Sequence, residues 1–266
     1  MAATKASFVL AVHGGAGTIP RYGPAASRAA SYHEGLQRAL AAGREVLASG
    51  GDALDGVTSA VVALEDDPRF NAGRGSDFSA AGTHEMDACV KEGVTHRAGA
   101  VAGILGPRNP VLAARAVMEC SRHVLMIGEG ALAFCREAGV AFCEPNYFYT
   151  EQRWCELQQA LEHRDDEAGG GTVGAVACDR HGNLAAATST GGRTGKAPGR
   201  MRTTRPAPYR RPAMGNFSSA MASGSRSPPA CATPAKHSTA PRRQSSVSLA
   251  RSGARAASSR SIAPVC

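Results

Sequence analysis

The chain has 266 residues, of which 43% are hydrophobic, and 30 basic against 22 acidic side chains give it a formal charge of +8. This length fits one large domain or two small ones, and the composition is that of a globular protein. The sequence contains no run of about 18 apolar residues and no secretory cleavage pattern after Ala6–Val12. We therefore expect a cytoplasmic protein with no membrane partner. The eight cysteines are scattered, which indicates reduced thiols rather than a disulfide framework or a zinc site.

The positive charge is concentrated at the C-terminal end. Residues 201–266 contain ten Arg, one Lys and no acidic side chain, whereas residues 1–200 hold 22 acidic against 19 basic side chains. A basic stretch is the usual signature of a nucleic-acid or anionic-surface partner. Because the body of the chain is slightly acidic, we do not expect it to bind nucleic acid. Such binding stays a rival hypothesis for residues 201–266 alone.

Apolar periodicity predicts alternating strands and helices in the first half of the chain. In order, these are a strand over Ser7–Val12 entering the turn His13–Gly17, a helix carrying Leu36, Leu40 and Leu47 that ends at Gly50-Gly51, a helix capped by Asp52 that ends at Asp66-Asp67, strands over Met86–Val90 and Ala98–Leu105, and a helix starting at Asn109-Pro110. We interpret Asp66-Asp67 as a helix end rather than a metal site and His13 as a structural histidine.

The second half continues the alternation and then loses it. The predicted elements are a strand over Val124–Ile127, a helix over Ala131–Ala138, a helix capped by Thr150, a flexible linker over Ala168–Gly171, and a hairpin of Thr172–Cys178 with Leu184–Thr190. Beyond Arg200 the sequence is rich in Ser, Ala, Pro and Arg and has no apolar stripe, so we expect disorder over residues 201–266. We divide the chain into residues 1–171, residues 172–200 and this tail.

Thr172 directly follows a glycine-rich linker, an unusual place for a strand to begin. A threonine hydroxyl is a poor nucleophile unless a base takes its proton, and a free α-amine on the same residue, with a pKa of roughly 8, can be that base. Exposing the amine requires cleavage of the Gly171–Thr172 bond. On pattern alone, a threonine in this position is more often an ordinary β-branched residue at a strand start than a nucleophile.

Several motifs resemble the plant-type asparaginase and isoaspartyl-peptidase family, in the family's order, over about residues 8–200. They are His13-Gly14-Gly15-Ala16-Gly17, Leu64-Glu65-Asp66-Asp67-Pro68 with Phe70-Asn71-Ala72-Gly73, Glu85-Met86-Asp87-Ala88, Gly171-Thr172-Val173-Gly174-Ala175-Val176-Ala177 and Ala187-Thr188-Ser189-Thr190-Gly191-Gly192. The resemblance implies an α+β fold, a four-layer αββα sandwich of the N-terminal-nucleophile hydrolase type. It also implies hydrolysis of L-asparagine and β-aspartyl dipeptides, self-cleavage between Gly171 and Thr172, and a homodimer of processed protomers.

The same resemblance assigns roles to individual residues. Thr172 is expected to be the nucleophile, with Thr190 as the hydroxyl that activates it. Asn71 is expected to line the site, and Arg200 to bind the substrate α-carboxylate, for which a guanidinium fork is suited. No catalytic metal or organic cofactor is expected, but the loop Leu64–Gly73 resembles one that holds a structural sodium ion.

The resemblance ends after Arg200. The family continues with Gly-Asp-Ser-Pro, whose Asp binds the substrate amine, and later with a Thr-Gly-x-Gly element, but here Thr203-Thr204-Arg205-Pro206 follows. A change of reading frame, alternative splicing or divergence are the open explanations. We expect a C-terminally incomplete sandwich with little activity. Its rivals are the glycosylasparaginase branch, a catalytically silent scaffold, and a protein whose tail binds nucleic acid or anionic surfaces.

Overall fold

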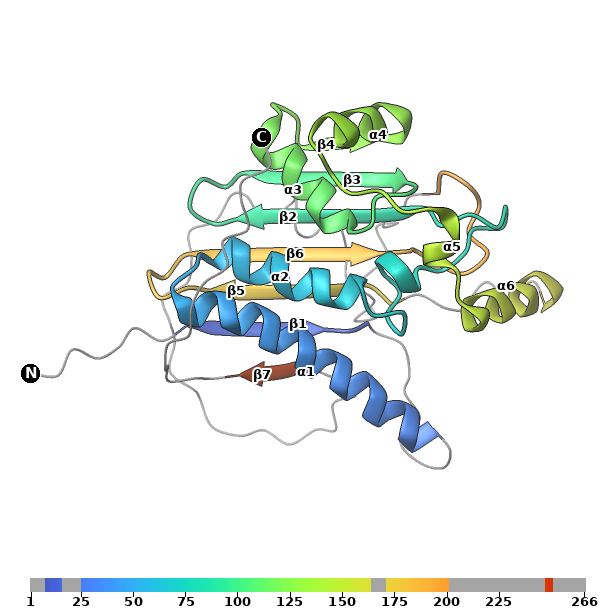
Figure 1. Ribbon diagram of the computed structural model, residues 1–266, viewed down its shortest axis with the longest axis horizontal. Helices are drawn as coiled ribbons and strands as arrows, with labels where there is room; N and C mark the ends of the chain where they lie inside the picture. The colour runs from blue at the N-terminus through green and yellow to red at the C-terminus, as the bar shows by residue number, and fades with distance from the viewer. Residues whose placement is uncertain (1–7, 16–24, 164–170, 201–246, 251–266) are drawn as a thin grey trace, which may run out of the picture.

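The computed structural model describes residues 8–15, 25–163, 171–200 and 247–250 (Figure 1). They form a seven-stranded sheet in the order β4-β3-β2-β6-β5-β1-β7. The β3–β4 pair is parallel and every other described pair is antiparallel. The strands are β1 Val9–His13, β2 Met86–Glu92, β3 Ala98–Ile104, β4 Leu125–Ile127, β5 Val173–Cys178, β6 Leu184–Thr190 and β7 Val247–Ala250.

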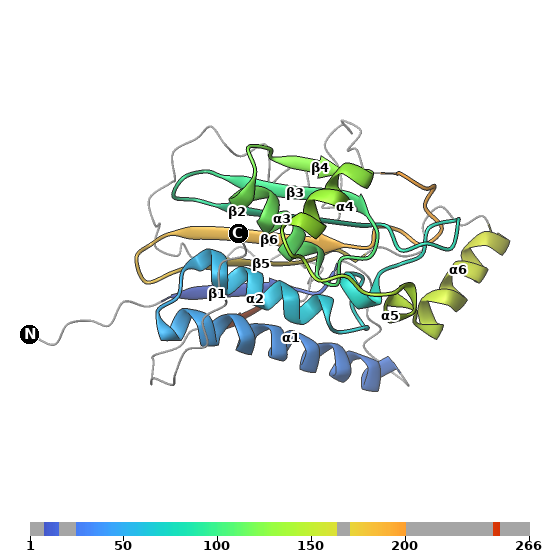
Figure 2. The same cartoon turned by 45° about the horizontal axis from the view of Figure 1, so that its top comes forward.

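Helices cover one face of this sheet, as Figure 1 and Figure 2 both show for α1, α2 and α3. The helices are α1 Ala25–Ser49, α2 Ala53–Glu65, α3 Pro110–Cys120, α4 Gly128–Glu137, α5 Pro145–Phe148 and α6 Glu151–His163, with a 3₁₀ turn η1 at Gly73–Gly75. Helix α6 stands beyond the end of β6 (Figure 1). It therefore extends the molecule past the sheet rather than covering it.

Side-chain alternation along the strands separates a core face from an open face. Val173, Ala175 and Ala177 of β5 join the core under α1 and α2, together with Ala185 and Ala187 of β6. Their neighbours in sequence point the other way, and Val176 and Leu184 are more than half exposed there. Thr190 and Thr188, which alternate with the buried Ser189 and Ala187, also lie on the open face.

Two helices receive their N-terminal caps from other segments. The side chain of Asp52, at the predicted cap position of α2, makes no capping hydrogen bond, and Asp179 accepts the Ala53 N–H instead at 3.3 Å. The Asn109 side chain likewise leaves the N-terminus of α3, where Glu65 accepts the Val111 N–H at 2.9 Å. A carboxyl oxygen is a good acceptor for the unpaired N–H groups of a helix start, so these two caps join the helices to the rest of the fold.

The structure confirms most predicted elements and differs in detail. The hairpin strand Leu184–Thr190 has the predicted bounds, Gly50-Gly51 ends α1, and Thr150 accepts the Arg153 N–H at 3.3 Å as a cap. The predicted elements did not include η1, the short helix α5 or β7.

Two expectations need correction, and a third is met in part. Val247–Ala250 of the predicted disordered tail forms β7, which pairs with β1; the other tail residues lie outside the described part. Cys120 is disulfide-bonded, whereas the other described cysteines are free thiols. The fold is α+β as predicted, but the described residues form one sheet and one helical layer, two of the four layers expected.

Candidate active site

The predicted nucleophile lies at the open end of the central hairpin. Strands β5 and β6 pair so that Val173 is opposite Ser189 and Gly174 opposite Thr188. Continuing this antiparallel register by one residue sets Thr172 opposite Thr190. Side chains directly opposite in adjacent strands are about 5 Å apart at Cβ, so the two predicted hydroxyls are brought together on the open face of the sheet.

The residue before the nucleophile contacts the glycine-rich turn after β1. A Cβ added to Gly15 would lie 2.9 Å from the Gly171 Cα, and one added to Gly171 would lie 3.4 Å from the Gly15 Cα. Gly15 also has a φ of +121°, a conformation open to glycine. This close backbone approach is possible because both residues lack side chains, and it places the predicted cleavage site against residues 14 and 15.

His13 lies beside the same bond. Burial lowers the pKa of its imidazole, while a hydrogen bond to the Thr172 backbone acts in the opposite direction. Residue 13 pairs with Gly174, where a Cβ would lie 2.6 Å from the His13 Nε2. The neutral ring therefore packs on the nucleophile strand, in agreement with the structural interpretation of this histidine.

The Thr190 hydroxyl is oriented by the turn that follows it. Its Oγ1 accepts the Gly192 N–H at 3.0 Å, which directs the hydroxyl hydrogen away from this turn. Gly192 has a φ of +85°, which favours glycine in this tight turn. The hydroxyl of Thr190 is thus available as a donor toward a partner such as Thr172.

Asn71 holds this turn through hydrogen bonds to Gly191 and Gly192. Its Nδ2 donates to the Gly192 carbonyl at 2.8 Å and to Asp77 Oδ2 at 2.8 Å, and its Oδ1 accepts the Asp77 N–H at 2.8 Å. The Asn71 carbonyl also accepts the Gly191 N–H at 3.1 Å. Asn71 lies next to the predicted site as expected, but both amide hydrogens are engaged by the protein itself, so it holds the turn in place.

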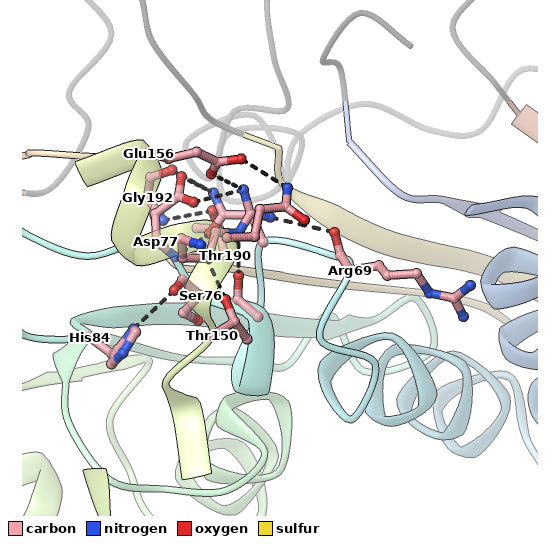
Figure 3. A network of polar contacts seen from close by, with 12 residues as sticks. Arg69, Ser76, Asp77, His84, Thr150, Glu156, Thr190 and Gly192 are labelled. Carbon is pink, nitrogen blue, oxygen red and sulfur yellow. Dashed lines mark hydrogen bonds and ion pairs between the residues drawn. The ribbon is translucent and has the colours of Figure 1, made fainter. Parts of the chain in front are cut away.

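Asp77 is fully buried and faces the guanidinium of Arg153 from α6. Figure 3 shows the labelled Asp77 close to Gly192 and Thr190. Arg153 Nη1 lies 3.1 Å from Asp77 Oδ1 and donates to Glu156 at 2.9 Å, while its Nε donates to the Gly75 carbonyl at 3.0 Å. Burial raises the pKa of Asp77 to about 6, and the Arg153 charge opposes that rise. The carboxyl is therefore mostly ionised at neutral pH.

Arg200 lies at the exposed rim, tied in through its neighbours. The Gly199 N–H donates to Glu85 Oε2 at 2.9 Å, and the buried Lys196 ammonium donates to the Glu85 carbonyl at 2.7 Å. Burial lowers the pKa of Lys196, and the nearby Arg200 charge lowers it further. A Cβ on Gly192 would lie 2.7 Å from the Lys196 Nζ. Gly199 and Lys196 therefore meet at Glu85, whereas the side chain of Arg200 itself is exposed.

The predicted sodium loop presents backbone oxygens where a monovalent cation could bind. A Cβ on Gly73 would lie 2.6 Å from the Glu65 carbonyl oxygen, and one on Gly75 would overlap the Pro68 and Phe70 carbonyl oxygens. Within the described residues, no group of His, Cys, Asp and Glu suited to a metal ion occurs. Carbonyl oxygens are the donor type that a hard cation prefers. Sodium binding by the loop stays a prediction from the sequence.

The polar residues that surround Asn71 and the Thr190 turn were not predicted from the sequence. Asp77, Arg153, Lys196 and the Glu85 side chain were not selected as candidates, although Glu85 belongs to a quoted motif. One signal was available: Arg153 precedes Leu157 by four residues, so it occupies the apolar stripe of α6 where an unpaired charge would be costly.

Comparison with known proteins identifies the class. A family model described as asparaginase matches residues 6–206. Isoaspartyl peptidases of Salmonella typhimurium and Escherichia coli are 49% and 50% identical over 204 residues, covering 73% of this chain. The isoaspartyl peptidase/L-asparaginase of Homo sapiens is 41% identical over 199 residues, covering 73% of this chain and 63% of its own length.

The chain belongs to the asparaginase family, a family of N-terminal-nucleophile hydrolases. The match covers 65% and 64% of the length of the two bacterial relatives. The match ends close to Arg200, which is also where this sequence stops showing the motifs of the family. No helix among the described residues is long and apolar enough to cross a membrane.

Proposed function

We propose that this chain is an amidohydrolase of the type that acts on L-asparagine and β-aspartyl dipeptides, with Thr172 as its nucleophile. The names printed for its relatives, isoaspartyl peptidase and L-asparaginase, supply the substrate class. The observation that supports the proposal best is the register of β5 and β6, which, continued by one residue, sets Thr172 opposite Thr190. The preceding residue, Gly171, lies against Gly15. A nucleophile next to an oriented hydroxyl is the arrangement that covalent catalysis by threonine requires.

Activation begins with attack of the Thr172 Oγ on the carbonyl carbon of Gly171. The Gly171–Thr172 C–N bond breaks, the hydroxyl proton passes to the leaving nitrogen, and an ester joins Gly171 to the Thr172 oxygen. Water hydrolyses this ester and leaves a carboxylate on Gly171 and a free amine on Thr172. The hydrogen bond between His13 and the Thr172 backbone, together with the Gly15 contact, holds the scissile bond in place.

Turnover uses the same hydroxyl with the new amine as its base, since an α-amine titrates at roughly pH 8. The Thr172 Oγ attacks the side-chain carbonyl of the substrate, ammonia or the dipeptide amine leaves with a proton, and water releases aspartate from the acyl-enzyme. Thr190 donates a hydrogen bond to the attacking oxygen. Arg200 is the proposed partner of the substrate α-carboxylate, and Leu64–Gly73 is the proposed sodium loop.

We propose that the chain as written turns over substrate slowly or not at all. Thr203-Thr204-Arg205-Pro206 stands where the family has the amine-binding Asp, and no Thr-Gly-x-Gly element follows. Loss of one oxyanion donor alone costs about 3 to 4 kcal/mol of transition-state stabilisation. The cytoplasmic location and the dimer of processed protomers stay predictions from the sequence.

Intact-mass analysis of the purified chain tests the nucleophile assignment. The expected fragments are residues 1–171 and the remainder, Thr172→Ala should give none, and Thr172→Ser should retain some cleavage. Thr188→Ala, on the same face of β6 and two residues from Thr190, is the matched control and should be cleaved like the parent. Cleavage at another bond, or cleavage that persists in Thr172→Ala, would refute the proposal.

A further inference from the structure

A continuous series of short polar contacts joins α6 to the Thr190 turn, and Figure 3 shows its members Asp77, Gly192 and Thr190 side by side. From α6 the contacts run from Arg153 to Asp77 at 3.1 Å and from Asp77 Oδ2 to Asn71 Nδ2 at 2.8 Å. They continue from Asn71 Nδ2 to the Gly192 carbonyl at 2.8 Å and from the Gly192 N–H to Thr190 Oγ1 at 3.0 Å. Each link leaves little room for rearrangement because Asp77, Asn71 and Gly191 are buried.

Asp77 fixes the orientation of the Asn71 side-chain amide. An amide side chain can be turned by 180°, which exchanges its oxygen and nitrogen. Asp77 prevents this at Asn71 because its carboxylate requires a donor while its backbone N–H requires an acceptor. The Asn71 NH₂ group must then face the Gly192 carbonyl, and a turned amide would set two oxygens against each other there.

The Asp77 carboxylate can play this part only while it stays charged in a buried place. Arg153 supplies the opposite charge with a side chain that is 11% exposed, and it is held in turn by the Gly75 carbonyl and Glu156. The contact to Asp77 Oδ1 is an ion pair without hydrogen-bond alignment. Arg153 therefore acts on Asp77 mainly through charge, which opposes the effect of burial.

We propose that Arg153 and Asp77 are positioning residues for the Thr190 hydroxyl, acting through Asn71 and Gly192. Neither residue touches the reacting atoms. Their function is to keep the Gly191-Gly192 turn in the one arrangement that orients the Thr190 oxygen toward the nucleophile strand. This inference rests on the proposed function for its meaning, but the arrangement of the turn is measurable without turnover.

The test is amide hydrogen exchange of Gly192 in the full-length chain, because this N–H reports directly on the bond to Thr190 Oγ1. In Arg153→Met, exchange at Gly192 should accelerate at least about tenfold, the factor that corresponds to the loss of one hydrogen bond. Amides of the β5–β6 ladder such as Ala187 should change less than about twofold, since no ladder hydrogen bond is removed. Arg153→Lys keeps the charge and should restore most of the protection.

Asp77→Asn is the second variant, because it keeps the side-chain shape if Arg153→Met does not fold. It removes the carboxylate that requires a donor and leaves only the backbone N–H of residue 77 to favour one orientation of the Asn71 amide, so Gly192 exchange should accelerate in the same direction. Arg108→Met is the matched control, an exposed arginine paired with Asp66 outside this network, and Gly192 should exchange in it as in the parent. Unchanged Gly192 exchange in both test variants, or an equal acceleration at every amide, would overturn the inference.

The rate of cleavage at Gly171–Thr172 gives a second readout. Where the parent cleaves itself, Arg153→Met and Asp77→Asn should slow cleavage in proportion to the loss of Gly192 protection, and Arg153→Lys should recover it. Cleavage that persists in Thr172→Ala would refute the nucleophile proposal and leave the exchange result intact. Fast cleavage in a variant whose Gly192 amide has lost protection would overturn the positioning role alone.

Discussion

Glu65 is the most perturbed carboxyl for which the structure gives a value, and its replacement by glutamine is a direct test of the fold. The side chain is fully buried at the end of α2, where Oε1 accepts the Val111 N–H and Oε2 has no hydrogen-bond partner among the described residues. Burial raises the pKa of Glu65 from 4.5 to about 8, opposed by Ser189, Val111 and Asn109. The neutral acid is therefore the form that the fold accepts.

The sign and size of the effect follow from linkage. A carboxyl whose pKa is higher in the folded than in the unfolded state stabilises the fold while it is protonated. The free energy of unfolding should therefore fall as pH rises from 4.5 toward 8. The difference between these values corresponds to about 5 kcal/mol in total, of which about 3 kcal/mol falls between pH 6 and pH 9. Glu65→Gln keeps an oxygen for the Val111 N–H and cannot ionise, so its unfolding free energy should lack this decline.

Urea unfolding followed by circular dichroism at pH 6 and pH 9 measures the effect. The stability of Glu65→Gln relative to the parent should increase by about 3 kcal/mol between the two pH values. Glu119→Gln, which removes a carboxylate of α3 paired with Arg115 at the surface, is the control and should follow the parent. Parallel pH dependence of the parent and Glu65→Gln would show that this carboxyl is hydrated and that the buried cap of α3 is wrong.

Three further outcomes test other parts of the structure. Gly191→Ala should destabilise the chain by about 1 to 3 kcal/mol, because its Cβ would overlap the Asn71 Oδ1, and melting temperature measures this. Asp179→Ala should cost about 1 to 2 kcal/mol in urea unfolding near neutral pH, since Asp179 caps α2 and accepts the His181 and Asn183 N–H groups. Ammonia release from L-asparagine should be near background for this chain and should appear when the family's missing segment is restored after Arg200; equal rates in the two would refute the reading of residues 201–266.

The sequence predicted the elements well because their signals are local. The apolar stripes of α1 and α2, the turn at Gly50-Gly51 and the hairpin of residues 172–190 each depend on residues within one or two turns of chain. The positions of the helix caps were predicted correctly, but the side chains that accept the N–H groups were not. Asp52 and Asn109 stand at the helix starts, but Asp179 and Glu65 supply the carboxyl oxygens from distant segments, a pairing that no local pattern contains.

The candidate site divides in the same way. Thr172 and Thr190 were predicted through motifs, and the register of β5 and β6, continued by one residue, sets them opposite each other. Asp77, Arg153 and Lys196 were missed because their roles come from burial, which depends on how α6 and residues 191–200 pack against the loop after α2. A single sequence carries only the weak sign of an arginine on an apolar helix stripe, and it cannot say which carboxylate that arginine meets.

The order of the strands has a consequence for the processed molecule. The first two strands that follow the Gly171–Thr172 bond, β5 and β6, lie in the middle of the sheet, with β1 on one side and β2 on the other, each contributed by the segment before that bond. A chain cut there would migrate as two pieces in denaturing electrophoresis and as one particle in native gel filtration. Separating the pieces would break the three antiparallel ladders that join them among the described strands, β1–β5, β2–β6 and β1–β7, together with their shared core. The cut would therefore release a new amine at Thr172 while leaving the body of the protein in one piece.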